Sequence, residues 1–346
     1  MLSGWNKRVK IIIGPANIDE DLTDFPVLLY LSSSSGTNNK DVVCVFNEIG
    51  ANRKKIAVTT SDGTTQCYVE IERWDEVAEK AWLWVKIPSI SSVVDTILYL
   101  YYDSLQADNA TYVGDPTSAA AQNVWDADFV AVYHFYETTG TAIHDSTSNS
   151  LHGTKTAQCT LGSTGVVGKC VDNDPSTGSI DGDGNLPATY STWTVEAWAQ
   201  LDATPGWGDL WADSTGTEMY PAQIWDAGQY GAYSSSQLRT TSTFPEDGTT
   251  WNYCVTKCDG VDTFVFWDGD QENTNGENRT IGGSWAIGDR TASGEEADGR
   301  IDEVRISKIA RPNHWIKATY NTVKDNVASY ADEQESGTYQ RLTKIT

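Results

Sequence analysis

The chain has few of the residues that several large classes of protein require. It is 346 residues long and holds 24 Lys and Arg against 48 Asp and Glu, a net charge of -24. Nucleic acids and anionic membranes both attract clustered basic side chains, so we expect neither as a partner. The apolar runs are only a few residues long, too short for membrane insertion.

The first residues lack the features of a secretion signal. The apolar run at 11–13 is short, and Pro15 follows it closely. Residues 5–13 alternate between apolar and polar side chains, as expected for a strand. We therefore expect the folded protein to begin near Met1, either because it is made without a signal or because a signal has been trimmed away.

The six cysteines contain no C-x-x-C motif, which argues against zinc ribbons and thioredoxin-type chemistry. An even number permits disulfides, and the pairs to consider are Cys44 with Cys67 and Cys159 with Cys170. Cys254 and Cys258 are four residues apart in one expected strand, a separation of roughly 13 Å. That distance is too long for a disulfide, so we expect both to be free thiols.

Short alternating segments separated by turn residues dominate the sequence. The 14 Trp and 16 Tyr suit the interior of β-sandwiches and also the flat faces of sugars. Helical periodicity is confined to two short segments, 118–123 and 312–320. We predict an all-β protein of two antiparallel β-sandwiches in series. The expected boundaries are 1–105 for the first domain, 106–123 for a linker, 124–320 for the second domain and 321–346 for a polar C-terminal tail or docking arm.

The segment at 299–307 predicts a strand with strict alternation. Ile301, Glu303 and Arg305 would point to one face, with Asp302, Val304 and Ile306 on the other. An acidic, glycine-bearing loop precedes this strand, and a short helix that contains Trp315 follows it. This pattern resembles the closing strand of a laminin-G-like, concanavalin A-like lectin/glucanase sandwich.

Further segments of the second domain resemble the same family, and the resemblance spans about 125–320. They are VAVYHF at 130–135 with Glu137, the loop at 145–154, WTVEAW at 193–198, the hairpin at 251–269, and residues 287–288. The resemblance implies that the second domain is a jelly roll. The stretch 200–250 is longer and richer in Trp than the family pattern leads us to expect.

The first domain resembles a family known as domain of unknown function 2341. The matching features are Trp5 with Arg8, the strand at 9–13, DLTDFPVL at 21–28, Phe46, YVEIERW at 68–74, AWLWVKIP at 81–88 and LYLYY at 98–102. The resemblance covers roughly residues 5–103 and implies no activity. A laminin-G-like module usually accompanies this domain.

The carboxylates expected of a glycoside hydrolase are incomplete. The glucanase relatives carry an E-x-D-x-x-E motif, and the nearest segment here, at 296–301, has Ile301 in place of the second glutamate. Glu70 and Glu72 share a strand face, which we interpret as a solvated surface. The four histidines have no G-x-S-x-G motif to accompany them. We predict no catalytic residues and no enzymatic activity.

Two groups of residues are candidates for binding. Asp181, Asp183 and Asn185 alternate with glycines, as in part of a calcium loop, so calcium is the expected cofactor although a plain solvated turn has the same pattern. Aromatic and hydrogen-bonding side chains that could form a carbohydrate-binding face are Trp207, Asp209, Trp211, Gln223, Trp225 and Asp226. The same spacing would also suit a strand that buries Trp211 and Trp225.

The sequence therefore favours a non-enzymatic protein that binds glycans or a host surface. The first hypothesis is a virion surface protein, such as a capsid decoration, spike or tail-fibre component, in a homo-oligomer or repeating assembly with other virion or surface-layer proteins. The absence of a signal peptide motivates this choice. The alternatives are an extracellular or cell-surface carbohydrate-binding adhesin of a bacterium or archaeon and, third, a glycoside hydrolase.

Overall fold

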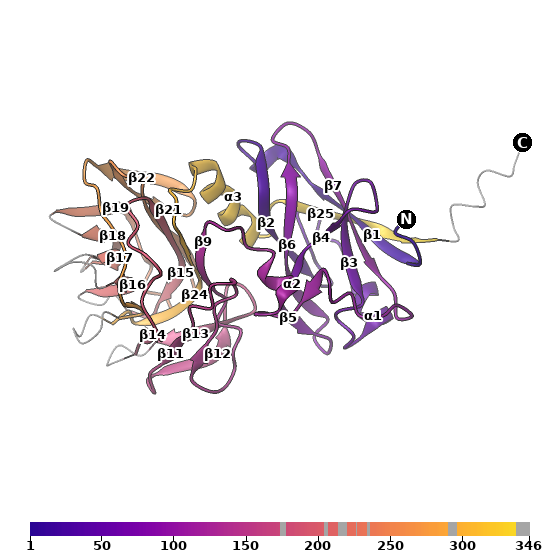
Figure 1. Ribbon diagram of the computed structural model, residues 1–346, viewed down its shortest axis with the longest axis horizontal. Helices are drawn as coiled ribbons and strands as arrows, with labels where there is room; N and C mark the ends of the chain where they lie inside the picture. Colours follow the sequence, from indigo (N-terminus) through magenta and orange to yellow (C-terminus); the bar gives the residue numbers. More distant parts are fainter. Residues whose placement is uncertain are drawn as a thin grey trace, which may run out of the picture. The chain divides into compact units, whose positions relative to one another are not determined.

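The computed structural model describes residues 1–173, 178–203, 207–213, 220–225, 227–233, 236–289 and 296–336. The chain forms two compact units, each built of β-sheets (Figure 1). The first unit comprises Met1–Asp126 and Asn321–Thr346, and the second comprises Ala127–Tyr320. The predicted all-β fold of antiparallel sandwiches is confirmed.

The described residues of the first unit form two sheets, with short helical segments between the strands. One sheet has the order β25-β1-β7-β3-β4, formed by β25 (Ala328–Glu335), β1 (Lys7–Ile13), β7 (Thr96–Tyr102), β3 (Ile56–Thr60) and β4 (Gln66–Cys67). The other has the order β2-β6-β5-β8, formed by β2 (Leu22–Leu31), β6 (Lys80–Ile90), β5 (Val69–Asp75) and β8 (Val113–Gly114). The helical segments are η1 (Pro15–Asn17), α1 (Cys44–Ile49) and α2 (Ala119–Gln122).

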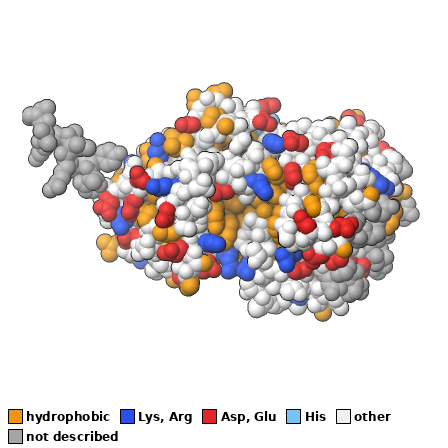
Figure 2. Space-filling view, turned by 180° about the vertical axis from the view of Figure 1, so that it is seen from behind, with side chains coloured by type: hydrophobic (Ala, Val, Ile, Leu, Met, Phe, Trp, Pro, Cys, Tyr) orange, Lys and Arg blue, Asp and Glu red, His pale blue; other side chains and the backbone are white. Residues whose placement is uncertain are grey.

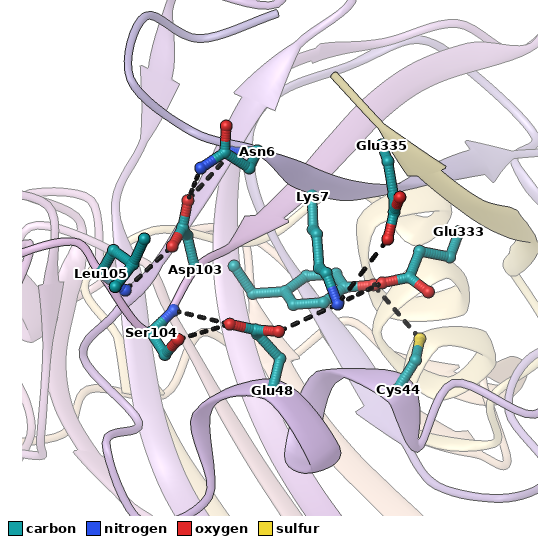
Figure 3. A network of polar contacts seen from close by, with 10 residues as sticks. Asn6, Lys7, Cys44, Glu48, Asp103, Ser104, Leu105, Glu333 and Glu335 are labelled. Atoms are coloured by element: carbon teal, nitrogen blue, oxygen red, sulfur yellow. Dashed lines mark hydrogen bonds and ion pairs between the residues drawn. The ribbon is translucent and has the colours of Figure 1, made fainter. Parts of the chain in front are cut away.

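The last strand of the chain belongs to the first unit. β25 pairs antiparallel with β1, with Ile11 opposite Tyr330 and Lys7 opposite Glu335. Figure 3 shows the polar contacts at one end of this pair, where Lys7 Nζ lies 2.9 Å from Glu48 of α1 and 3.5 Å from Glu333 of β25. The stretch predicted as a polar tail or docking arm therefore supplies an edge strand to the sheet that begins at the amino terminus.

The stretch predicted as a linker also has structure. β8 pairs in parallel with β5, placing Val113 opposite Val69, and both valines are buried. Helix α2 follows, and the Ser118 hydroxyl accepts a hydrogen bond from the Ala121 N–H at its amino end. The predicted short helix at 118–123 is thus present, within the first unit.

In the part of the second unit that the structure describes, the strands form two eight-stranded sheets. The first has the order β10 (Ala142–Ile143), β11 (Gly153–Lys155), β14 (Ile180–Gly182), β23 (Trp285–Ile287), β16 (Gly208–Asp213), β17 (Tyr220–Ile224), β18 (Gln229–Tyr233) and β19 (Gln237–Thr243). The second has the order β12 (Cys159–Thr164), β13 (Lys169–Asn173), β24 (Gly299–Ser307), β15 (Trp193–Leu201), β20 (Asn252–Cys258), β21 (Thr263–Trp267) and β22 (Asp270–Asn275), with β9 (Phe129–Tyr133) on β24. Helix α3 (Asn313–Val323) follows β24.

Strand β24 does not alternate strictly as predicted. Its pairing with β15 shifts register between Asp302 and Arg305, and Glu303 has a φ of +50°. This irregularity brings Ile301, Val304 and Ile306 into the same hydrophobic core. A β-bulge has this effect, because its extra residue reverses the side-chain alternation that follows. The prediction that Ile301 faces away from Val304 and Ile306 is therefore wrong.

All six cysteines are free thiols, and five of them are buried. Cys159 lies opposite Asn173 in the β12–β13 pair, whereas Cys170 lies opposite Ser163. The two cysteines are thus several residues out of register, too far apart for the short Cα separation that a disulfide requires. The pairs considered from the sequence are not formed.

The visible surface carries charges of both signs. On the face shown in Figure 2, acidic side chains are scattered over the described residues, with Lys and Arg between them. Among the described residues, no helix is both long enough and apolar enough to cross a membrane.

Candidate functional site

The candidate site lies on four neighbouring strands of the second unit, β16 to β19 (Figure 1). Ala222 and Ile224 of β17 belong to the hydrophobic core of this unit. Side chains alternate along a strand, so Gln223 and the following Trp225 point to the opposite face of the sheet. This face carries the candidate site.

A row of residues crosses the four strands at one level. Asp209 of β16 lies opposite Gln223 of β17, Gln223 lies opposite Gly231 of β18, and Gly231 lies opposite Arg239 of β19. An isolated bridge also places Glu296 beside Asp209. The row therefore runs from the acidic Asp209 to the basic Arg239, with the Gln223 amide between them. Neighbouring strands in it are about 4.8 Å apart.

Gln223 is the chemically distinctive member of this row. Its side chain is fully buried, and neither Oε1 nor Nε2 has a hydrogen-bond partner. Leaving a buried amide unsatisfied costs about 1–3 kcal/mol, so such a group usually has a ligand or an ordered water as a partner. The opposing residue on β18 is Gly231, which presents no side chain. A Cβ there would meet the Leu238 carbonyl oxygen at 1.9 Å, so the backbone itself requires glycine.

Aromatic rings surround Trp225 beside the row. The ring of Trp207 lies 4.8 Å from that of Trp225, and the ring of Tyr233 lies 6.0 Å away in an edge-on arrangement. The Arg239 guanidinium carbon is 4.1 Å from the Trp225 ring centroid, a cation–π contact. Trp225 is fully buried, whereas Trp207 is 41% exposed and forms the accessible margin of the site.

Four of the six residues predicted for a carbohydrate-binding face lie together here: Trp207, Asp209, Gln223 and Trp225. Trp211 differs, because it belongs to the hydrophobic core. The β16–β17 pairing shifts register between Asp209 and Trp211, and this bulge turns Trp211 to the core side. Asp226 lies outside the described residues.

Sequence reasoning missed three residues of this face: Arg239, Tyr233 and Glu296. Tyr233 comes from β18 and Arg239 from β19, two strands that the sequence analysis did not single out. Glu296 is far from β16 in the sequence and reaches it only through the isolated bridge. No local motif signals these neighbours, because the register of non-consecutive strands decides them.

The predicted calcium residues lie at the end of β14 and after it. Asp181 Oδ1 accepts a hydrogen bond of 3.2 Å from the Ser179 hydroxyl, and Asp183 Oδ1 accepts one of 2.8 Å from the Thr154 hydroxyl. Asn185 is exposed. In the described part of the chain, no group of three metal-ligating side chains forms at this loop. The donor set found here is smaller than the 6–8 oxygens that Ca²⁺ prefers, and calcium binding stays a prediction.

The two carboxylates on β5 are not on a solvated face. Glu70 is fully buried and accepts a hydrogen bond of 2.6 Å from the indole N–H of Trp125. Glu72 is also buried and accepts one of 2.8 Å from Trp84. The interpretation of these residues as a solvated face is therefore wrong, and both carboxylates serve as partners for buried tryptophans.

The comparison with protein families concerns the second unit. Residues 174–317 match the model of the concanavalin A-like lectin/glucanases superfamily. The second unit thus contains a concanavalin A-like domain, and β14 to β24 with the candidate site lie inside the matched segment. The match begins later than the predicted resemblance, which starts near residue 125. The resemblance of residues 5–103 to domain of unknown function 2341 stays a prediction.

Several solved structures are similar to this chain in fold. Domain 4 of an extracellular arabinanase from Geobacillus stearothermophilus aligns at 17% identity and a TM-score of 0.45, over 56% of this chain and 98% of that domain. The binding domain of Paraclostridial Mosquitocidal Protein 1 aligns at 13% identity and 0.47, over 56% and 52%. Trypanosoma rangeli sialidase aligns at 11% and 0.47, over 76% and 46%. No curated protein sequence matches the chain.

Proposed function

We propose that this is a non-enzymatic surface protein of a virion whose second unit binds glycans through the Gln223 face. The observation that supports glycan binding most strongly is the buried, unpartnered Gln223 amide beside the cluster formed by Trp207 and Trp225. Sugars present C–H groups that pack on aromatic rings, and hydroxyl groups that pair with amides and carboxylates. Both kinds of protein partner are adjacent on this face.

The free thiols support the choice of a virion protein. Five buried cysteines without a disulfide are typical of proteins that fold in a reducing compartment. A virion component assembled inside the host cell folds under such conditions, whereas a secreted adhesin folds in an oxidising one. In this proposal the first unit serves as the base that docks onto the repeating assembly.

Glycan-array binding by matched tryptophan variants tests the proposed function. Trp207→Ala removes the exposed ring of the site, and we expect it to weaken binding by about tenfold, the effect of losing roughly 1.4 kcal/mol of contact. Trp82→Ala removes a partly exposed tryptophan from β6 of the first unit and should bind like the wild type. Absence of binding to any glycan, or equal losses in both variants, would refute glycan binding by this face.

The pairing of Asp209 with Glu296 favours glycoside hydrolysis as a second candidate, because hydrolysis requires two carboxylates on one face. We expect no release of reducing ends from a panel of polysaccharides. Hydrolysis that Asp209→Asn and Glu296→Gln both abolish would replace the non-enzymatic proposal with an enzymatic one.

Virion association needs its own test. Purified particles from a host that makes this protein should contain it in many copies per particle, visible by mass spectrometry and by antibody labelling in electron micrographs. Its recovery only from cell envelopes would favour the adhesin alternative.

A further inference from the structure

Two unpartnered polar groups lie next to each other on the candidate face. Gln223 lacks partners for its carbonyl oxygen and its amide nitrogen, and Trp225 lacks an acceptor for its indole N–H. Gln223 lies in β17 and Trp225 directly follows the strand, so their Cα atoms are about 7 Å apart and their side chains share a face. An acceptor and a donor thus stand side by side.

The chemistry of the two groups restricts what could satisfy both. A hydroxyl offers its donor and its acceptor at a single oxygen, whereas a trans secondary amide offers an N–H on one side and a C=O on the other. Its N–H can donate to one partner while its C=O accepts from another.

From these groups we infer that Gln223 and Trp225 recognise the acetamido group of an N-acetylated sugar, an inference that rests on the proposed glycan binding. The acetamido N–H donates to Gln223 Oε1, and its C=O accepts from the indole N–H of Trp225. The methyl group packs on the aromatic cluster of Trp207, Trp225 and Tyr233. Gln223 Nε2 then remains to donate to a neighbouring ring hydroxyl.

An unpartnered indole N–H also occurs elsewhere in the described part of the second unit, but without an unpartnered amide of the kind that Gln223 provides beside Trp225. Trp211 and Trp285 also have indole N–H groups without a partner, but both belong to the hydrophobic core, and among the described residues Gln223 is the one amide with both polar atoms unpartnered. The competing occupant of the Gln223 face is buried water, which would satisfy the same groups without any preference among sugars.

Calorimetric titration with matched trisaccharides tests the inference. The N-acetylglucosamine trimer, its de-N-acetylated form and the glucose trimer share one backbone and differ in the substituent at one carbon. We expect the acetylated trimer to bind at least about tenfold more tightly than the other two, because two hydrogen bonds of about 1 kcal/mol each are lost without the acetamido group. A parallel arm with N-acetylgalactosamine and galactose asks whether the preference extends to a second source of acetamido sugars, and a preference in either arm supports the inference.

Variants locate the preference on the protein. Gln223→Leu replaces the unpartnered amide with an apolar side chain of similar volume, a change that spares the fold. Trp225→Phe removes the indole N–H and keeps an aromatic ring. We expect both to reduce the preference for the acetylated sugar to less than threefold, and Trp211→Phe, which removes an indole N–H on the core side, to leave it unchanged.

The possible failures are distinguishable. Equal affinity for the acetylated and non-acetylated trimers, or a preference that survives Gln223→Leu and Trp225→Phe, would overturn the acetamido inference and leave glycan binding intact. Absence of binding to every sugar, on the array and in the calorimeter, would overturn the proposed function and this inference with it.

Discussion

The backbone N–H of Gly36 donates a 2.7 Å hydrogen bond to the carboxylate of Asp325, although 289 positions separate the two residues. Asp325 follows α3 in the left-handed backbone region, with a φ of +55°, and precedes the last strand. The contact thus connects the β2–α1 loop to the segment that delivers β25. It holds together two parts of the first unit that the second unit separates in the sequence.

This contact predicts a pH dependence of stability. Burial raises the pKa of Asp325 to about 6 from an ordinary 3.8, and its Oδ1 has no partner. The folded state therefore binds the proton more tightly than the unfolded state, and stability falls as the pH rises from about 3.8 to above 6. Asp325→Asn keeps an acceptor for Gly36 and should stabilise the protein at pH 7.5 by about 1–2 kcal/mol, after allowance for partial exposure, with no gain at pH 3.

Denaturant unfolding at the two pH values measures this effect. Asp332→Asn is the matched control, since Asp332 lies in β25, is exposed and pairs with Lys40, which lowers its pKa. The Asp332→Asn variant should be no more stable to unfolding than the wild type at pH 7.5. An Asp325→Asn variant that is equally stabilised at both pH values would contradict the titration of Asp325.

Removal of the last strand should destabilise the first unit selectively. A chain that ends at Val327 loses β25, the buried Tyr330 side chain and the Lys7–Glu333 ion pair. We expect the unfolding transition of the first unit to fall by more than about 10 °C, because a sheet edge and a core side chain are lost. The transition of the second unit should be unchanged.

Scanning calorimetry compares this truncation with a chain that ends at Ser336. The longer chain retains all of β25 and should unfold like the full-length protein. Identical transitions in both truncated chains would show that β25 contributes nothing to the first unit.

A buried charge network predicts a large effect of one substitution. His134 Nδ1 lies 2.5 Å from Glu303 Oε1, and Arg305 also pairs with Glu303. Burial opposes ionisation of Glu303, but the neighbouring His134 and Arg305 hold its pKa below the usual value. Glu303→Leu should cost about 3–5 kcal/mol, because it leaves a buried guanidinium without this carboxylate.

The double variant Glu303→Leu/Arg305→Met separates loss of a charge pair from loss of volume. It should recover most of the stability in denaturant unfolding, because neither charge is then left alone. The wild type should lose the contribution of Glu303 as the pH falls through its lowered pKa, since stability from a depressed carboxyl is present only above that range. A double variant as unstable as the single one would count against this account.

The cysteines should be inaccessible to thiol reagents in the native protein, and unfolding without a reductant should be enough to expose them. Burial raises the pKa of Cys67 to about 12 and that of Cys254 well above its ordinary value, so their reactive thiolates are scarce. In denaturant without reductant, a thiol reagent should find all six cysteines free. In the native protein only the half-buried Cys44 should react within minutes. Fewer than six thiols in the denatured protein would reveal a disulfide.

The two tryptophans that the sequence places on one face should behave differently. Trp211 is fully buried in the core, so Trp211→Ala should cost about 3–5 kcal/mol of unfolding free energy. Trp207 is 41% exposed, and Trp207→Ala should cost less than about 1 kcal/mol. Denaturation followed by far-UV circular dichroism compares the two without depending on tryptophan fluorescence. Equal losses would mean that the two rings share one environment.

Local patterns were sufficient for part of the candidate site. The segment from Trp207 to Trp225 combines large aromatic residues with Asp209 and Gln223, and this composition alone indicated a binding face. Gln223 and Trp225 share one side of the sheet, as period-two alternation along a single strand requires. It failed for Trp211 and for Val304, where bulges reverse the alternation at positions that no residue type marks.

The sequence by itself determined that the protein is built of β-strands and which short segments can contribute aromatic and hydrogen-bonding side chains, because both properties depend on neighbours within a few residues. Its resemblance to the concanavalin A-like family also indicated the fold of the second unit. Only the tertiary structure decided that Arg239 and Glu296 join the row of Gln223, that the cysteines remain unpaired, and that the last strand returns to β1. Each of these depends on the register between strands far apart in the chain, which side-chain packing over the whole unit selects.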